Sequence, residues 1–445
     1  MRCIRFALAA IPLVSFLLMH GAARAGGFAL NEMGAASVGN AHAGGAAAAE
    51  DLSTIYFNPA GLSRMRGRQF MGALSAIRPS AEFGNRGSSF APGIALTGGN
   101  GGDAGSWAAV PALYYAMDLP FNPQLRFGIG VQSPFGLRTE YDDGWVGRYQ
   151  ALTSELKSVN INPTLSYRVN DSLSFGAGIS AQYVDVELSR AIDVGTICAV
   201  RVGAACTALG LRPQASDGRV TVSGDDWGYG FNLGVLYSPT NATRFGAAYR
   251  SKISHGLSGD ASFSTPAGTP AALITGAGFV NTGASANVDL PESLSFSAYA
   301  DIDPRWSVMG DLTWMRWNRF RELRIRFNSG IPDSVTPEQW RNTVRVAFGA
   351  NYRYTDIWKL RAGVAYDQSP VRSEFRTPRI PDNNRVWLSI GAQYKPSANG
   401  AWDFGYAHLF VKDSSIDKTE TLGGRLTGNY ENNVNILSVQ YSHAF

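Results

Sequence analysis

The feature that most constrains the fold is an alternation of apolar residues with small or polar ones, which runs from Gln69 to the last residue. Successive side chains of a β-strand point to opposite faces, so this period of two predicts strands with one apolar face. In segment 229–237, tyrosine, phenylalanine, leucine and valine alternate with glycine and asparagine. In segment 358–367, Arg361 and Asp367 fall on the face opposite the apolar residues. Charge is thus confined to one face.

The connections between these segments alternate in length. Short turns such as 121–124, 170–172 and 303–305 alternate with long, variable stretches. That arrangement is typical of a transmembrane β-barrel, which has short turns at one rim and long loops at the other. An even strand number is the rule for such barrels. We predict fourteen antiparallel strands, at 69–83, 105–118, 124–137, 157–169, 172–189, 219–238, 243–260, 283–301, 305–328, 340–354, 358–375, 385–395, 401–416 and 431–445.

The start of the chain has the pattern of a cleaved signal peptide. Arg2 and Arg5 precede the apolar stretch 6–19, and Ala23-Arg24-Ala25 forms a small-residue cleavage site. A short membrane anchor is the alternative, but the apolar stretch is shorter than the roughly 20 residues that a helical span needs. Residues 1–25 are therefore excluded from the fold.

Composition argues against two other classes of protein. A soluble β-sandwich also alternates, but it would not place so many tyrosines at strand ends, where they suit the interfacial girdles of a barrel. Lys and Arg number 39 against 35 Asp and Glu, and three of the arginines lie in the leader. The nearly neutral mature chain gives no reason to expect a nucleic-acid partner.

The last strand alternates up to an aromatic terminus, with Leu437, Val439, Tyr441, His443 and Phe445 on one face. This pattern resembles the C-terminal signature by which outer-membrane barrels are recognised for assembly. We therefore expect two partners besides a ligand, namely outer-membrane lipid and the barrel-assembly machinery, the latter through the strand that ends in Phe445.

Residues 26–68 do not alternate and are rich in Gly, Ala, Asn and Ser, which predicts a compact segment of short helices and turns inside the barrel. A flexible periplasmic extension is the alternative. The mature chain resembles the FadL-type outer-membrane transporters of long-chain fatty acids or aromatic hydrocarbons. The resemblance rests on "GFALNEMGAASVGNAHAGGAAAAEDLSTIYFNPAGLS", "SPFGLRTEY", "WVGRY", "LPESLSFSAYADIDPRWSVMGDLTWMRW", "LRAGVAYDQSPV" and "IPDNNRVWLSIGAQY", in this order.

The resemblance implies a barrel of fourteen strands, 69–445, closed by an N-terminal hatch, 26–68. It also implies that a hydrophobic ligand is captured among the outer loops, binds inside, and leaves sideways through a gap at a kink in the third strand when the hatch moves. By resemblance, Asn58, Pro59 and Ala60 belong to the hatch, and Gly26, Gly27 and Phe28 contact the ligand.

The residues themselves offer candidates for each step. Pro134 lacks an N–H, so Ser133, Pro134, Phe135 and Gly136 are candidates for a lateral opening; alternatively, Pro134 simply ends the strand. Apolar residues in loops 138–156 and 261–282 are candidates for capture, unless they pack on one another and cap the barrel. The loop candidates are Trp145, Tyr149, Leu273, Ile274 and Phe279.

A fatty acid would need a cationic partner for its carboxylate, because an unpaired charge in an apolar pocket is costly. The candidates are Arg148, Lys157, Arg316 and Arg319, whereas an aromatic hydrocarbon would need none.

The remaining sequence features favour a transport protein over an enzyme. Cys198 and Cys206 are candidates for a local disulfide, since an exported chain favours one over a metal site. No G-x-S-x-G, phosphate-loop or zinc motif is present, so we expect no enzyme, catalytic residue, metal or cofactor. The predicted function is passive uptake of hydrophobic molecules, most of all long-chain fatty acids, with an aromatic hydrocarbon transporter or a general porin as alternatives.

Overall fold

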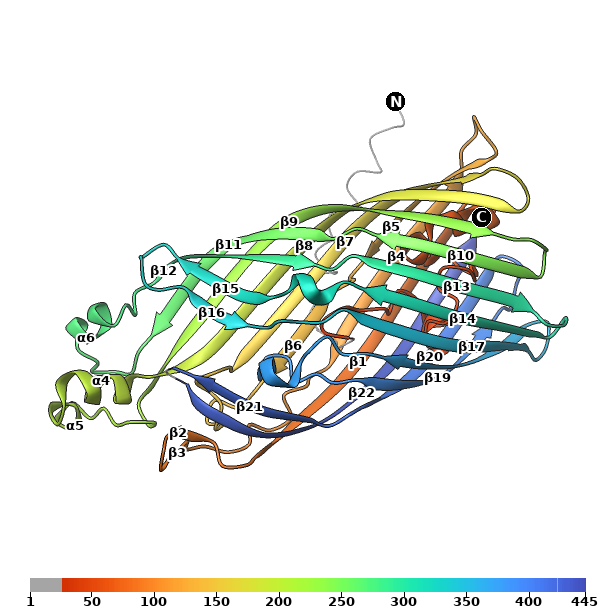
Figure 1. Ribbon diagram of the computed structural model, residues 1–445. Coiled ribbons are helices and arrows are strands. Elements are labelled where there is room, and N and C mark those ends of the chain that lie inside the picture. The colour runs from red at the N-terminus through yellow and green to blue at the C-terminus, as the bar shows by residue number, and fades with distance from the viewer. Residues whose placement is uncertain (1–25, 422) are drawn as a thin grey trace.

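A computed structural model describes residues 26–421 and 423–445, so the predicted signal peptide lies outside the described residues. The described chain forms a closed antiparallel barrel of fourteen strands, as predicted, with the last strand paired to the first (Figure 1). Closure leaves no unpaired sheet edge, which lipid would not tolerate. Bends divide several barrel strands into two labelled segments.

The first seven barrel strands, in chain order, are β1 (Gln69–Asn85), β4 (Ala108–Asp118), β5 (Leu125–Gln132) with β6 (Gly136–Glu140), β7 (Thr153–Arg168), β8 (Leu173–Asp193), β9 (Asp217–Tyr237), and β10 (Thr243–Arg250) with β11 (Ile253–Ser264). The last seven are β12 (Thr282–Leu290) with β13 (Ser293–Asp301), β14 (Trp306–Met315) with β15 (Glu322–Phe327), β16 (Ser334–Pro337) with β17 (Thr343–Arg353), β18 (Trp358–Asp367), β19 (Arg385–Tyr394), β20 (Gly400–Val411) with β21 (Ser414–Glu420), and β22 (Gly424–Ala444). A small hairpin, β2 (Ser89–Ala91) and β3 (Ile94–Ala95), lies in the first outer loop.

Two predicted strands differ most in length from those of the structure. The strand expected at 358–375 ends at Asp367, and the chain then forms an outer loop with the short helix η3 (Ser373–Phe375). Pro370 cannot donate to a ladder, which explains why the pairing is not continued. The strand expected at 431–445 starts at Gly424 instead, because its polar outer part pairs with β21.

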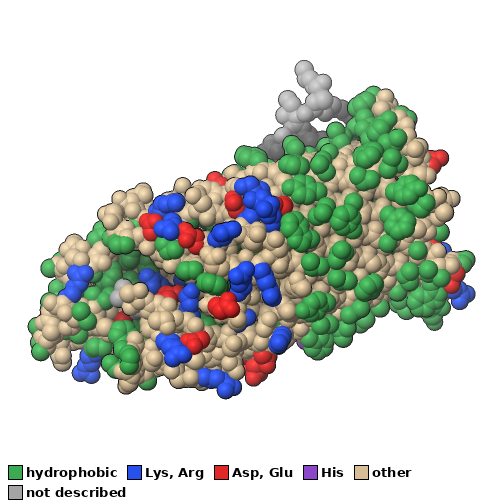
Figure 2. Space-filling model, in the orientation of Figure 1, with side chains coloured by type: hydrophobic (Ala, Val, Ile, Leu, Met, Phe, Trp, Pro, Cys, Tyr) green, Lys and Arg blue, Asp and Glu red, His purple; other side chains and the backbone are tan. Residues whose placement is uncertain are grey.

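The predicted lipid face is exposed in the structure. Tyr229, Phe231 and Leu233 of β9 are 73%, 44% and 47% exposed, whereas Asn232 between them is buried. Figure 2 shows hydrophobic side chains over the half of the barrel that carries β10, β13 and β14, and charged side chains over the half near β12, β15 and β16. The barrel therefore projects beyond its apolar band on the side of the long loops.

The N-terminal segment, residues 26–68, fills the opposite half of the lumen. It contains α2 (Ala35–Gly39), α3 (Thr54–Phe57) and the 3₁₀ helix η1 (Pro59–Arg64). The first of these contacts β18, β19, β20 and β22, and η1 contacts β7, β8 and β9. Most of its side chains are buried, as compact packing inside the wall requires. No helix among the described residues is long and apolar enough to cross a membrane.

Candidate functional site

An apolar cavity lies inside the barrel between the N-terminal segment and the outer loops. Its wall is formed by strands β6, β7, β8, β9, β11, β12 and β15, and its polar contributions come chiefly from Glu338 and Arg379. The apolar side chains that line it are Phe28, Leu137, Leu156, Val186, Leu188, Val222, Leu257, Val288, Phe320, Leu323, Ile325 and Ile380. Such a lining, with few polar groups, suits a hydrophobic ligand.

Phe28 closes one end of this cavity within a cluster of aromatic rings. Its ring centroid lies 4.8 Å from that of Trp317, 5.5 Å from that of Trp340, and 6.0 Å from those of Phe135 and Phe320. These separations are those of favourable edge-to-face pairs. The N-terminal segment is thereby fixed at the cavity by the residue that the resemblance assigned to ligand contact.

The two glycines before Phe28 allow this close approach. Gly27 has φ +69, and a Cβ at this position would lie 2.7 Å from a ring carbon of Trp340. Gly26 lines a second, more polar cavity together with Asp311, Arg345 and Asp367. Residues 26–28 thus separate the apolar cavity from the polar one.

The third barrel strand is interrupted at Ser133, Pro134 and Phe135. Pairing between β4 and β5 ends at Leu113 and Val131, and β6 pairs with β7 but not with β4. The alternative that Pro134 simply ends the strand is wrong, because β6 resumes at Gly136.

The N-terminal segment supplies hydrogen bonds at this interruption. The amide of Gly136 donates to the carbonyl of Phe28 over 2.9 Å, and the amide of Leu30 donates to the carbonyl of Pro134 over 2.8 Å. The hydroxyl of Ser158 on β7 accepts from the Phe135 amide and donates to the Phe135 carbonyl. Side-chain and N-terminal contacts therefore replace the missing ladder.

Asn58, Pro59 and Ala60 anchor the N-terminal segment to the opposite wall. The Asn58 side chain donates to the carbonyls of Ala46 (2.6 Å) and Val235 (2.9 Å) and accepts from the amide of Ala60 (3.0 Å). Gly234 faces this group, and a Cβ there would lie 1.9 Å from Asn58 Oδ1. The tripeptide lies directly against strand backbone.

All four cations expected to meet a ligand are already paired with carboxylates. Arg148 lies 2.6 Å from Asp217, Lys157 lies 3.0 Å from Glu155, and Arg316 and Arg319 both contact Glu292. None of the four lines the apolar cavity. The structure thus places them in ion pairs of the wall and loops.

Arg379, which the sequence reasoning missed, lies at the cavity instead. Its guanidinium donates to the carbonyls of Thr153, Gln150 and Ser189 and to the hydroxyl of Ser154, all of them neutral acceptors. Burial lowers its pKa to about 10, so it remains charged at neutral pH. The one sequence signal was an arginine placed between prolines in the apolar stretch Pro378-Arg379-Ile380-Pro381.

Glu338 is another ionisable group of the cavity, besides Glu155, and sequence reasoning missed it too. Burial raises its pKa to about 8. The carboxyl oxygen Oε2 accepts a hydrogen bond of 2.9 Å from Trp340 Nε1. The group is therefore mostly protonated at neutral pH. The carboxylate that acts most strongly on Arg379 is that of Glu420, which also lies 3.9 Å from Arg190.

The loop expected to offer exposed aromatic residues forms a cap instead. Trp145 is fully buried, Tyr149 is 1% exposed, and the ring of Tyr141 stacks on that of Trp145 at 3.9 Å. Neither Trp145 nor Tyr149 lines the apolar cavity. The alternative in which this loop packs on itself and caps the barrel is what the structure shows.

A groove at the outer end is adjacent to the apolar cavity. Its wall includes Phe279, and Arg379, Leu188, Val222 and Ile325 line both spaces. Leu273 on α6 (Ala271–Gly276) is buried, and Ile274 beside it is only half-buried. Of the three apolar candidates in this loop, Phe279 alone lines the groove.

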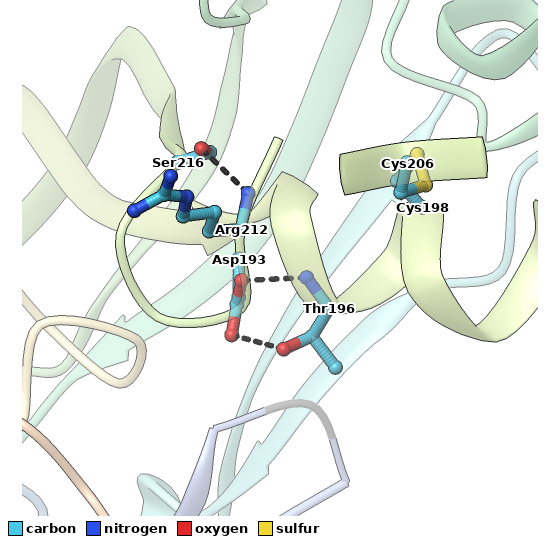
Figure 3. Close-up of a disulfide and its surroundings, with 6 residues drawn as sticks. All are labelled: Asp193, Thr196, Cys198, Cys206, Arg212 and Ser216. Atoms are coloured by element: carbon cyan, nitrogen blue, oxygen red, sulfur yellow. Dashed lines mark hydrogen bonds between the residues drawn. A yellow bond between two sulfur atoms is a disulfide. The ribbon is translucent and has the colours of Figure 1, made fainter. Parts of the chain in front are cut away.

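A disulfide joins Cys198 on α4 (Val194–Val202) to Cys206 on α5 (Ala205–Ala208) (Figure 3), and Phe279 of the groove packs against the cluster that contains these cysteines. Asp193 caps α4 by accepting from the amide and the hydroxyl of Thr196. Leu273 packs in the same cluster as the two cysteines. The disulfide thus belongs to the outer loops and not to the barrel wall.

Within residues 26–421 and 423–445, no group of three or more His, Cys, Asp or Glu side chains is placed to hold a metal ion. The cavity and groove offer a place for an apolar molecule, and two arginines, Arg190 in the groove and Arg379 in both spaces, are available to an acidic group.

Comparison with known proteins agrees with this geometry. The family model described as Outer membrane protein transport protein (OMPP1/FadL/TodX) matches residues 16–445. A putative outer membrane protein of Neisseria meningitidis serogroup B is 32% identical, with 94% of each chain covered. A long-chain fatty acid transport protein of Escherichia coli O6:H1 is 30% identical, with 89% of each covered.

Solved structures show the same fold. A FadL homologue of Pseudomonas aeruginosa superposes with a TM-score of 0.86 at 27% identity, covering 94% of this chain and all of the other. The Pseudomonas putida toluene transporter TodX superposes with a TM-score of 0.69 at 20% identity, covering 93% of this chain and 98% of the other. The protein is an outer-membrane β-barrel for transport of hydrophobic compounds, and it belongs to the OMPP1/FadL/TodX family.

Proposed function

We propose that the protein takes up long-chain fatty acids across the outer membrane by passive transport. The observation that carries the proposal is the position of Arg379, a guanidinium that lines both the outer groove and the apolar cavity. A fatty acid is an apolar chain with one carboxylate, and it would match a guanidinium that stands where the mainly apolar cavity meets the groove. The E. coli relative named as a long-chain fatty acid transport protein supports the same substrate class.

The acceptors of Arg379 favour this role over a structural ion pair. Its hydrogen bonds reach three main-chain carbonyls and one hydroxyl, so its positive charge is not cancelled by them. A carboxylate would form a charge-assisted, bidentate contact with such a group. Glu338 is mostly protonated at neutral pH, the nearby carboxylate of Glu420 contacts Arg190, and neither group is within 4.0 Å of Arg379 in the described part of the chain.

Movement of residues 26–30 would then release the ligand. These residues both close the cavity through Phe28 and bond to the interrupted third strand through Leu30. Lateral exit at residues 133–136 suits an acyl chain, because each CH₂ exposed to water costs about 0.8 kcal/mol. The ligand would pass into membrane lipid without crossing the periplasmic rim.

The experiment replaces Arg379 by glutamine in a strain that lacks the chromosomal copy and measures uptake of a labelled long-chain fatty acid and of a labelled alkylbenzene. Loss of one charged hydrogen-bond partner, worth about 1.5–3 kcal/mol, predicts roughly 10- to 100-fold weaker fatty-acid binding and slower uptake, with alkylbenzene uptake unchanged. Arg316→Gln is the control, since Arg316 is paired with Glu292 outside the cavity. Equal uptake of the fatty acid by both variants would overturn the proposal.

A transporter of aromatic hydrocarbons is the second candidate. The cluster of Phe28, Trp317, Phe320 and Trp340 at the end of the cavity favours it, as does the likeness in fold to a toluene transporter. This candidate predicts that wild-type cells take up the alkylbenzene at least as fast as the fatty acid, and that Arg379→Gln changes neither rate.

We further propose two macromolecular contacts. Outer-membrane lipid would cover the exposed aromatic and aliphatic side chains of the apolar band. The assembly machinery would recognise β22 before it pairs with β1, through a strand whose last residue, Phe445, is 70% exposed. Deletion of Phe445 should then lower the amount of folded barrel in the outer membrane, which heat-dependent electrophoretic mobility measures.

A further inference from the structure

Two carboxylates that face the start of the mature chain share one arginine. Asp382 lies 2.5 Å from Arg385, and Asp367 lies 3.8 Å from the same guanidinium. Asp367 and Asp382 are only 5% and 3% exposed. In the described part of the chain, Arg385 is the one cationic side chain within 4.0 Å of either carboxylate.

The first two residues after the expected cleavage site reach both carboxylates. The amide of Gly26 hydrogen-bonds to the carboxylate of Asp367, and the amide of Gly27 donates to Asp382 Oδ2 over 3.1 Å. A Cβ on Gly26 would lie 3.2 Å from Asp367 Oδ1, so the backbone comes very close to this group.

One oxygen of this pair has no hydrogen-bond partner among the described residues. Asp367 Oδ2 is buried and accepts no hydrogen bond from a described residue, because Arg385 Nε lies 3.8 Å away, too far for one; Asp382 Oδ2, in contrast, also accepts from the hydroxyl of Ser369 over 2.7 Å. A buried carboxylate without enough donors is unfavourable. Asp367 can therefore accept a further, closer donor beside Gly26.

The neighbouring cations are occupied elsewhere. Arg345 donates to the carbonyl of Ala41 and lies 4.0 Å from Asp311. Arg376 donates to the main-chain carbonyls of Asp382 and Ser415 and not to a carboxylate.

We propose that the α-ammonium group created by cleavage between Ala25 and Gly26 docks on Asp367 and completes this site. Cleavage replaces one amide N–H by three N–H donors and a positive charge, at the position where Asp367 Oδ2 lacks a hydrogen-bond partner among the described residues. Charge-assisted bonds of this kind are stronger than those of an amide. Removal of the leader thereby fixes residues 26–30 in the position that closes the cavity, independently of which ligand is transported.

The test begins with the wild-type protein purified from outer membranes. Mass spectrometry should find Gly26 as the first residue; a different first residue overturns the proposal. Limited reductive methylation then compares the reactivity of the α-amine in the folded and the unfolded chain. We expect the α-amine to react at least about tenfold more slowly in the folded protein, as expected for a docked group that must open before it reacts.

Asp367→Asn supplies the second arm, because it keeps the shape of the side chain and removes its charge. We expect the α-amine of this variant to react several-fold faster than in the wild type. The matched control is Asp403→Asn, which changes a buried carboxylate that pairs with Arg361 elsewhere in the lumen. Equal rates in folded and unfolded wild-type protein, or an unchanged rate in folded Asp367→Asn, overturn the proposal; the wild-type comparison stands even when the variant does not fold.

Discussion

The amide of Gly136 donates a hydrogen bond of 2.9 Å to the carbonyl of Phe28, so that the interrupted third strand and the start of the mature chain are directly joined. The side chain of the same phenylalanine closes the apolar cavity. One displacement of residues 26–30 would therefore open the cavity and remove the hydrogen bonds at the interruption together. We therefore expect the proposed ligand release and wall opening to be coupled.

Replacing Phe28 by alanine should loosen this segment. Removing a buried phenylalanine from a packed cluster costs about 3–5 kcal/mol, and here the loss falls on the docking of residues 26–30 and not on the closed barrel. We expect faster hydrogen exchange at the amides of Leu30 and Gly136, measured by mass spectrometry. The control is Phe245→Ala, which removes a half-exposed ring from the outer face. Unchanged exchange at both amides would contradict the coupling.

Lateral release predicts where a bound acyl chain touches the protein on its way out. A fatty acid with a photoreactive group near its methyl end should crosslink to residues 133–136 and to the facing part of 104–110, where the ladder between β4 and the third strand is missing. Peptide mapping locates the crosslinks. If they fall only on the short turns of the opposite rim, such as 121–124 and 170–172, the ligand passes through the barrel and lateral release is wrong.

Asn58 should control the attachment of the N-terminal segment to the wall. Asn58→Ala removes a donor from the buried carbonyl of Ala46, at a cost of about 1–3 kcal/mol for an unsatisfied buried group, and from the part-buried carbonyl of Val235. We expect residues 46–60 to become sensitive to proteases while the barrel stays folded. Limited proteolysis compares this variant with Asn287→Ala, which changes an exposed asparagine of β12. Equal resistance of the two would show that the tripeptide is not an anchor.

The barrel could be predicted because its pattern is local: along each strand, apolar residues that face lipid alternate with small or polar residues that face the lumen. The carboxylates that pair with the cations could not be predicted, since ion pairs join residues that are distant in sequence. Arg148 meets Asp217 from 69 positions away, and Arg379 reaches the cavity from a loop that was assigned to no element. A loop that exposes its aromatic residues and a loop that packs them into a cap can have the same composition. The burial of Trp145 could therefore be seen only in the folded structure.

The disulfide should stabilise one outer loop and leave the barrel unchanged. A double variant, Cys198→Ala with Cys206→Ala, opens a short covalent loop that contributes roughly 2–3 kcal/mol. We expect faster protease cleavage within 194–216 and an unchanged melting temperature of the barrel. Leu273 packs on the same cluster, so Leu273→Ala should increase cleavage in the same region without touching the covalent bond. A large fall in the melting temperature of the double variant would contradict a local role.

Glu338 should make the stability of the protein depend on pH. Burial raises the pKa of its carboxyl group to about 8 in the folded protein, from about 4.5 when unfolded. The folded state therefore holds a proton that the unfolded state releases, so this contribution to stability is complete below about pH 4.5 and is lost as the pH rises through about 8.

The free energy of unfolding should fall by up to about 1.4 kcal/mol for each pH unit in this interval. Glu338→Gln removes the ionisable group but keeps an acceptor for Trp340 Nε1, so its melting temperature in detergent should vary less between pH 5 and pH 8. Burial also raises the pKa of Glu32 to about 7, so the melting temperature of the Glu338→Gln variant should still depend on pH, but less steeply than that of the wild type. Glu374→Gln, a change at an exposed position in the same outer loops, should keep the wild-type slope. Parallel melting curves for wild type and Glu338→Gln over this range would show that Glu338 is ionised in the folded protein, and that Arg379 does not keep its charge free for a ligand.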